Sequence, residues 1–188
     1  MEVSSVSESS IDDWDTDGLE ENEFGFFAAL LIHFPEIASV RTSSDDSLLS
    51  ITFLLASNPD PKLVRSFDEH FNRSLAALSR VIGDGVERIA KTSVLFFDDI
   101  ASLQVVRPLH SVVAEEFPIL RGMVLETFGK LVIVESEQKE SAGGWELDLG
   151  ENGEAYPLEH TLRRFKASGA KGHLYGFRDG ERVLVYRA

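Results

Sequence analysis

The order of hydrophobic patterns between residues 47 and 136 constrains the fold of this chain more than any other feature. Strand-like segments show a side-chain period of two or a continuous apolar run, whereas helical segments repeat every three to four residues. The region therefore predicts the order strand, helix, strand, strand, helix, strand. The predicted strands cover residues 48–56, 87–97, 102–107 and 131–134, and the predicted helices cover residues 61–82 and 109–128.

This βαββαβ order is that of the split βαβ, or ferredoxin-like, fold. We therefore predict an α+β protein with a ferredoxin-like core at about 47–137 inside a single domain at 20–188. An N-terminal helix and strand precede the core and a β-α-ββ extension follows it, with elements at 20–34, 37–41, 145–149, 157–166, 174–178 and 181–186. Folds of this class host enzymes, ligand sensors and interaction modules, so the fold alone indicates no activity.

A second interpretation divides the chain into four groups of one helix and two strands. These groups would begin near Glu20, Pro61, Leu109 and Pro157 and would give two related αββαββ halves. No repeat of individual residues accompanies this order, so both interpretations stay open.

The segment from Pro61 to Ile82 carries the most complete helix pattern in the chain. Asp60 is a favourable N-cap, Pro61 suits the first helical position, and Gly83 suits the left-handed conformation of a C-cap. An apolar stripe recurs at spacings of three and four residues and comprises Leu63, Phe67, Phe71, Leu75, Leu78 and Ile82. The pattern predicts one continuous helix with this stripe in the core.

The helical pattern at 109–128 contains Pro118, which predicts a kink near Phe117 or a restart of the helix at the proline.

The negative charge of the chain is concentrated at its N-terminus. Residues 1–60 hold 13 acidic residues and one basic residue, Arg41. This segment therefore supplies most of the net charge of −14 that all 188 residues carry. Residues 1–19 are rich in Ser, Asp and Glu, which predicts a disordered acidic tail. Trp14 lies among its aspartates and marks either an incidental exposed residue or a docking element that folds on a partner. A chain of this charge repels phosphate backbones, so we expect no nucleic-acid binding.

Composition excludes several further classes of protein. The chain has no cysteine, which removes disulfides, thiolate chemistry and Cys-based metal sites and fits a reducing cytoplasm. The N-terminus lacks the basic and apolar regions of a secretory signal, and no apolar run approaches the roughly 20 residues of a membrane span. We therefore expect a cytoplasmic protein that does not bind a membrane.

Motifs for catalysis, cofactors or metals are missing. None of the five histidines forms an HxxxH or HExxH pair, and no glycine-rich phosphate loop or GxSxG elbow occurs. Asp98-Asp99 reads as the turn of a hairpin, and Glu115-Glu116 reads as the charged outer face of a helix. The sequence thus predicts no catalytic residue, no metal site and no cofactor.

The most distinctive polar feature is a group of basic residues near the C-terminus. Arg163, Arg164, Lys166 and Arg178, with Lys171, could receive an anion or an acidic protein segment. Together with Trp14, these residues are the candidate partner-binding residues.

Two functions follow from these observations. The first is a non-enzymatic protein-interaction, regulatory or chaperone-like module that binds a protein partner. The second is a small enzyme or ligand-binding domain with a basic pocket lined by Tyr156, His160, Arg163 and Arg164. The sequence leaves the oligomeric state open, with a homodimer among the options.

Overall fold

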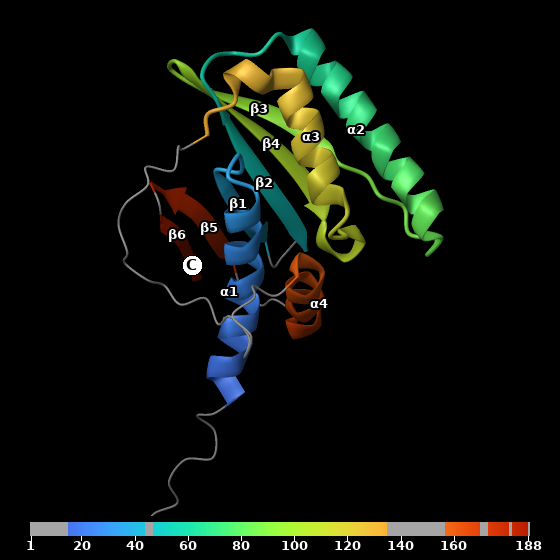
Figure 1. Cartoon of the computed structure of the whole chain (residues 1–188), viewed down its shortest axis with the longest axis vertical. Helices are drawn as coiled ribbons and strands as arrows, with labels where there is room; N and C mark the ends of the chain where they lie inside the picture. Colours follow the sequence, from blue (N-terminus) through green and yellow to red (C-terminus); the bar gives the residue numbers. More distant parts are fainter. Residues whose placement is uncertain (1–14, 44–46, 135–156, 170–172, 181, 188) are drawn as a thin grey trace, which may run out of the picture.

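The computed structural model describes residues 15–43, 47–134, 157–169, 173–180 and 182–187. This part of the chain has a mixed α+β architecture with four α-helices and a six-stranded antiparallel sheet (Figure 1). The helices are α1 Asp15–His33, α2 Pro61–Ile82, α3 Glu116–Phe128 and α4 Leu158–Ser168. The strands are β1 Ser39–Ser43, β2 Leu48–Leu55, β3 Lys91–Phe97, β4 Ile100–Pro108, β5 Leu174–Asp179 and β6 Arg182–Arg187.

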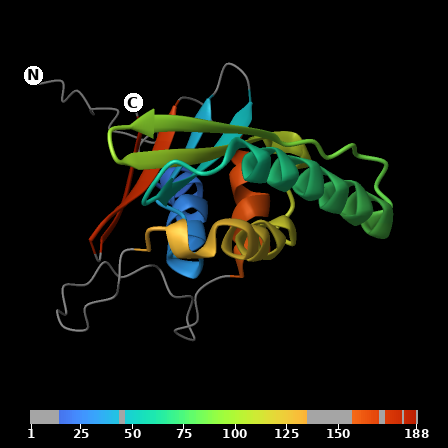
Figure 2. The same cartoon turned by 90° about the horizontal axis from the view of Figure 1, so that it is seen from above.

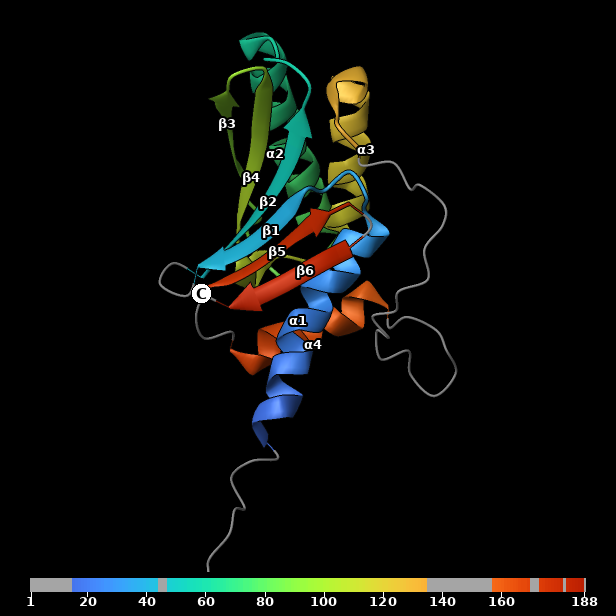
Figure 3. The same cartoon turned by 90° about the vertical axis from the view of Figure 1, so that its left-hand side faces the viewer.

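The sheet consists of three antiparallel hairpins placed side by side. Its strand order is β3-β4-β2-β1-β5-β6, so β1 and β2 lie at the centre and β3 and β6 form the two edges (Figure 3). The register pairs Ser39 with Thr52 in the central hairpin and Val94 with Leu103 in the β3–β4 hairpin. The C-terminal hairpin predicted from Asp179-Gly180 is present, but Asp179 belongs to β5 and pairs with Arg182, so the loop begins one residue later than predicted, at Gly180 with its positive φ of 59°.

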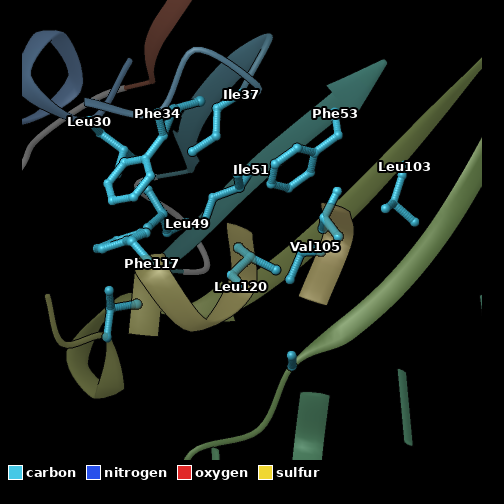
Figure 4. Packing of buried hydrophobic residues seen from close by; sticks show 14 of the residues in the cluster. Leu30, Phe34, Ile37, Leu49, Ile51, Phe53, Leu103, Val105, Phe117 and Leu120 are labelled. Atoms are coloured by element: carbon cyan, nitrogen blue, oxygen red, sulfur yellow. The ribbon is translucent and has the colours of Figure 1, made fainter. Parts of the chain in front are cut away.

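In the part of the chain that the structure describes, the α-helices all lie on one side of the sheet (Figure 2). Alternate residues of β2 point toward these helices and are fully buried: Leu49, Ile51, Phe53 and Leu55. The core between the two layers is rich in aromatic rings, and Figure 4 shows Phe34, Phe53 and Phe117 within it. Burial of these large apolar side chains provides the main driving force for the fold.

The helix predicted at Pro61–Ile82 is confirmed with the same bounds as α2. The Asp60 carboxylate accepts a hydrogen bond from the Lys62 backbone N–H at 2.8 Å, and Gly83 adopts the left-handed conformation. The middle of the apolar stripe is buried, as predicted, at Phe67, Phe71 and Leu75. The prediction is wrong at the two ends of the stripe, because Leu63 and Ile82 are exposed where α2 extends beyond the core.

The predicted interruption at Pro118 is also found. The segment after β4 forms a short 3₁₀ turn at Leu109–Ser111, and α3 begins only at Glu116. Pro118 therefore lies in the first turn of α3, where the backbone N–H that proline lacks has no partner within the helix.

The strand predicted at 131–134 is wrong. Residues Gly129–Leu131 form a 3₁₀ turn, and Val132 makes a single antiparallel bridge to Leu55. The reason lies elsewhere in the sheet, because β1 already pairs with β2 along residues 48–52. Only the last residues of β2 remain open, where the Ile133 N–H donates to the Leu54 carbonyl at 2.8 Å.

Helix α1 begins earlier than predicted. Residues 15–19 were assigned to the acidic tail but belong to this helix, because acidic residues are also favourable in the first turn of a helix. Residues 1–14, including Trp14, lie outside the described residues, as do the predicted strand at 145–149 and Tyr156. Among the helices described, none is long and apolar enough to span a membrane.

The alternative order of four helix-strand-strand groups holds for three of them. Helices α1, α2 and α4 are each followed by a hairpin of the sheet. The group that would begin at Leu109 contains α3 but, in its described part, no regular strand.

Candidate interaction surface

The side of the sheet opposite the helices carries the main candidate site. We call it the open face, because none of the four described α-helices covers it (Figure 2). Its positions follow from the alternation of each strand, since residues next to the buried ones point the other way. Apolar or aromatic residues of the open face are Leu48, Leu54, Leu95, Phe97, Ile100, Val106, Tyr175, Phe177, Leu184 and Tyr186.

The positions between these residues are mostly small and uncharged: Ser39, Ser50, Thr52, Ser93, Ser102 and Gln104. The charged side chains of the open face are Arg41, Lys91, Asp179 and Arg182. Only Arg41 belongs to the central hairpin, whereas charged residues make up 27% of the whole chain. Depletion of charge combined with aromatic residues is typical of the centre of protein interfaces.

An aromatic group covers the open face on β5 and β6. The rings of Tyr175 and Tyr186 stack with centroids 5.4 Å apart, and Phe177 contacts Tyr186 edge to face at 6.0 Å. The backbone below is held close to α1, because a Cβ atom at Gly176 would lie 2.9 Å from the Phe27 ring. Tyr186 remains 47% exposed, so its ring is available to a partner.

A second apolar group lies at the end of the β3–β4 hairpin. Leu95, Phe96, Phe97 and Ile100 surround the Asp98-Asp99 turn, and Phe97 is 61% exposed. The residues of this group that precede the turn form a continuous apolar run at the end of β3, and such a run indicates a buried strand when the sequence is read alone. The structure places the run at an edge of the sheet, where only one neighbouring strand covers it.

Two depressions interrupt the open face. One, of about 250 Å³, is lined by Pro35, Ala38, Ser39, Thr52, Leu54, Ile133, Phe177 and Arg178. The other, of about 350 Å³, is lined by Arg41, Thr42, Ser43, Leu48, Ser50, Val106, His173 and Tyr175. Neither contains a residue of α4, where the sequence suggested a basic pocket.

The basic residues predicted as a binding group serve separate local contacts. On α4, Arg163 donates to the Glu159 carboxylate at 2.7 Å one turn earlier, and Arg164 is exposed. Lys166 donates to the carbonyls of His110 and Val112, in the segment between β4 and α3. Arg178, on β5, donates to the Leu31 carbonyl near the end of α1. Lys166 and Arg178 thus contact different parts of the backbone rather than forming one site. Lys171 lies outside the described residues.

A buried cluster of charges was missed by the sequence interpretation. Glu116 was expected on the outer face of a helix but is 1% exposed and pairs with Arg107, which is fully buried. Burial raises the pKa of the Glu116 carboxyl, and the hydrogen bonds from Arg107 act against that effect. Nearby, Arg88 is also buried and pairs with Asp84 at 2.5 Å. Arg107 and Glu116 satisfy each other away from solvent, whereas the buried Nε of Arg88 has no hydrogen-bond partner. The cluster therefore joins parts of the fold and offers no opening to a substrate.

Other forms of chemistry find no support in the described residues. No group of three or more His, Asp or Glu side chains within them is arranged to hold a metal ion. His70 is exposed on α2, as expected for a histidine on a solvated helix surface. Comparison with models of protein families, with curated proteins and with solved structures finds no match to this chain.

Proposed function

We propose that this chain is a non-enzymatic protein-interaction module and that the open face binds a protein partner. The observation that carries the proposal is the composition of that face, where charged residues are limited to Arg41 and to the strand ends at Lys91, Asp179 and Arg182. Groups of exposed aromatic and apolar residues on one face of a domain are typical of an interaction site. A regulatory or chaperone-like role is compatible with such a surface.

The size of the depressions in the open face favours a protein partner over a small ligand. Their volumes of about 250 and 350 Å³ lie near the lower end of the range of small-molecule sites, which is roughly 300–1,000 Å³. The net charge of −14 and the scarcity of basic residues at the centre of the face oppose nucleic acid, which requires a positive surface. A partner of mixed apolar and polar surface matches both the rings of β5–β6 and the serines between the strands.

We also infer that residues 47–137 are organised as a ferredoxin-like unit. The support comes from the strand order, since β4 lies between β3 and β2. Leu55 pairs with Ala101 of β4 and bridges to Val132, so Val132 must lie on the other side of β2. A βαββαβ unit places its fourth strand beside the first in this way. The unit here would have its fourth strand reduced to one bridge.

The proposal is tested by comparing variants in affinity capture from the native host. Tyr186→Lys and Tyr186→Glu introduce opposite charges at the same position of the open face. Leu63→Lys is the matched control, because Leu63 is 43% exposed on α2, on the helical side of the sheet. Quantitative mass spectrometry then measures which proteins each variant retains.

We expect both Tyr186 variants to lose the same partner by about tenfold or more, the effect of removing roughly 1.4 kcal/mol of binding free energy. Leu63→Lys should retain that partner at the wild-type level. If a protein is captured equally by wild type and both Tyr186 variants but lost by Leu63→Lys, the helical side is the binding surface and the proposal is wrong. Thermal unfolding of each variant shows whether it is folded.

A further inference from the structure

Strand β3 is an edge of the sheet whose backbone is open to another strand. Among the described strands it pairs only with β4, in a register that closes the hairpin with Phe97 opposite Ile100. Residues that flank a two-residue hairpin loop normally share hydrogen bonds, and such pairs then alternate along the strands. Thr92, Val94 and Phe96 therefore direct their N–H and C=O groups away from β4.

The two edges of the sheet differ in how they are protected. Edge strands of monomeric proteins usually carry charged residues that oppose pairing with another chain. On β6, Arg182 and Arg187 are both exposed and lie at the two ends of the strand. On β3, Lys91 is the one charged residue, and the strand ends in Val94, Leu95, Phe96 and Phe97.

We propose that β3 pairs with β3 of a second copy of this chain, which joins two sheets edge to edge in a symmetric dimer. A two-fold axis between identical strands makes them antiparallel. Each copy would supply the backbone groups of 92, 94 and 96, and the apolar residues at 94–97 would cover one another. This inference concerns the sheet edge and does not depend on what binds the open face.

Charge complementarity supports the second copy as the occupant. With the axis at Leu95, Lys91 at the start of β3 in one copy lies beside the Asp98-Asp99 turn that follows β3 in the other. Antiparallel self-pairing thus brings Lys91 close to an aspartate twice, once on each side of the axis. A parallel arrangement would instead place identical charges side by side.

The negative net charge of the chain does not oppose this contact, because the excess of acidic residues lies in segments of the chain other than β3. Residues 1–23 hold nine acidic residues and no basic one, and residues 135–156 hold seven acidic residues and one basic residue. The remaining residues, which include β3, hold 16 acidic and 17 basic residues. The β3 edge therefore belongs to a nearly neutral body.

A charge swap separates this dimer from other forms of association. Within one chain Lys91 and the turn residue Asp99 lie at opposite ends of β3, which spans roughly 20 Å, and cannot contact each other. We compare wild type, Lys91→Asp, Asp99→Lys and the double variant Lys91→Asp/Asp99→Lys. Arg182→Glu, at the opposite edge, is the control. Analytical ultracentrifugation of the full chain without any partner measures the dissociation constant of the dimer.

We expect each single variant at 91 or 99 to weaken the dimer about tenfold, because two symmetric contacts become repulsive. The double variant should return the dissociation constant to near the wild-type value, and Arg182→Glu should leave it unchanged. A protein that stays monomeric up to about 1 mM overturns the proposal. A dimer that Lys91→Asp leaves intact, or that the double variant does not restore, also overturns it. Tyr186→Lys should dimerise normally, so this test is independent of the capture experiment.

Discussion

Arg107 and Glu116 form a two-point ion pair that is sealed inside the protein. The Arg107 Nε donates to Glu116 Oε1 at 3.1 Å, and Nη2 donates to Oε2 at 2.8 Å. The remaining guanidinium nitrogen donates to the Ile89 carbonyl. The pair connects β4 to the first turn of α3 and to the segment before β3, three parts of the chain that the sheet alone would not hold together.

Replacing one member of this pair should lower the free energy of unfolding more than replacing both members with apolar residues. Glu116→Gln leaves a buried guanidinium without its counter-ion, and we expect a loss of about 3–5 kcal/mol of unfolding free energy. Arg107→Met/Glu116→Leu replaces the pair with apolar side chains and should lose clearly less than Glu116→Gln. Urea denaturation measures both changes. A double variant that is less stable than the single one would show that the ion pair is itself the main stabilising contact.

The Asp84–Arg88 pair should make stability depend on pH in the acid range. The hydrogen bond from Arg88 lowers the pKa of Asp84 from 3.8 to about 2, so folding favours the ionised carboxylate. The contribution of the pair is therefore complete above about pH 4 and is lost as the pH falls through about 2. Asp84→Asn abolishes this dependence, so the stabilities of wild type and variant should converge on acidification. A constant difference between them from pH 5 to about 2 would contradict the assignment.

Phe71 lies at the centre of the α2 stripe and is fully buried. Its ring takes part in an aromatic contact with Phe67, with centroids 5.9 Å apart. Phe71→Ala should lower the unfolding free energy by about 3–5 kcal/mol, because it removes a buried ring and leaves a cavity. Chemical denaturation tests this value, and a loss below about 1 kcal/mol would mean that α2 does not pack on the sheet as described.

Two glycines should respond in opposite ways to the same substitution. A Cβ atom at Gly176 would meet Phe27 at 2.9 Å and Leu31 at 3.2 Å, so Gly176→Ala should cost about 1–3 kcal/mol. Gly122 lies inside α3 with no atom within 4 Å of such a Cβ, and Gly122→Ala should stabilise the protein by about 0.5–1 kcal/mol. Melting temperatures of the two variants provide the comparison. A neutral change at Gly176 would contradict the packing of α1 on β5, and a destabilising change at Gly122 would contradict the open surroundings of that residue in α3.

The parts of the fold that depend on local chemistry could be predicted from the sequence. Helix α2 carries its N-cap, its apolar stripe and its C-cap in consecutive residues, so its bounds were found without knowledge of any neighbour. The C-terminal hairpin was signalled in the same way by Asp179-Gly180. The break before α3 followed from the restrictions that Pro118 imposes on the backbone.

The parts that depend on distant contacts could not be predicted. The run at 131–134 has the composition of a strand, but β1 occupies the edge of β2 that it would need. Glu116 reads as a surface residue until the register of β4 places Arg107 beside it. The open face was also out of reach, because an alternating strand does not show which of its two sides the helices cover. The basic residues chosen as a site are scattered because α4 and β5 direct them to different backbone carbonyls.

Footprinting of the complex tests most directly the claim that the open face is the binding surface. Hydroxyl-radical oxidation of the full chain is measured by mass spectrometry, alone and with the protein that wild type retains and Tyr186→Lys loses. We expect oxidation of Tyr175, Phe177 and Tyr186 to fall on binding, while the exposed α2 residues Leu63 and Val81 stay unchanged. Protection of the α2 residues with no change at the three aromatic residues of β5 and β6 would contradict the account.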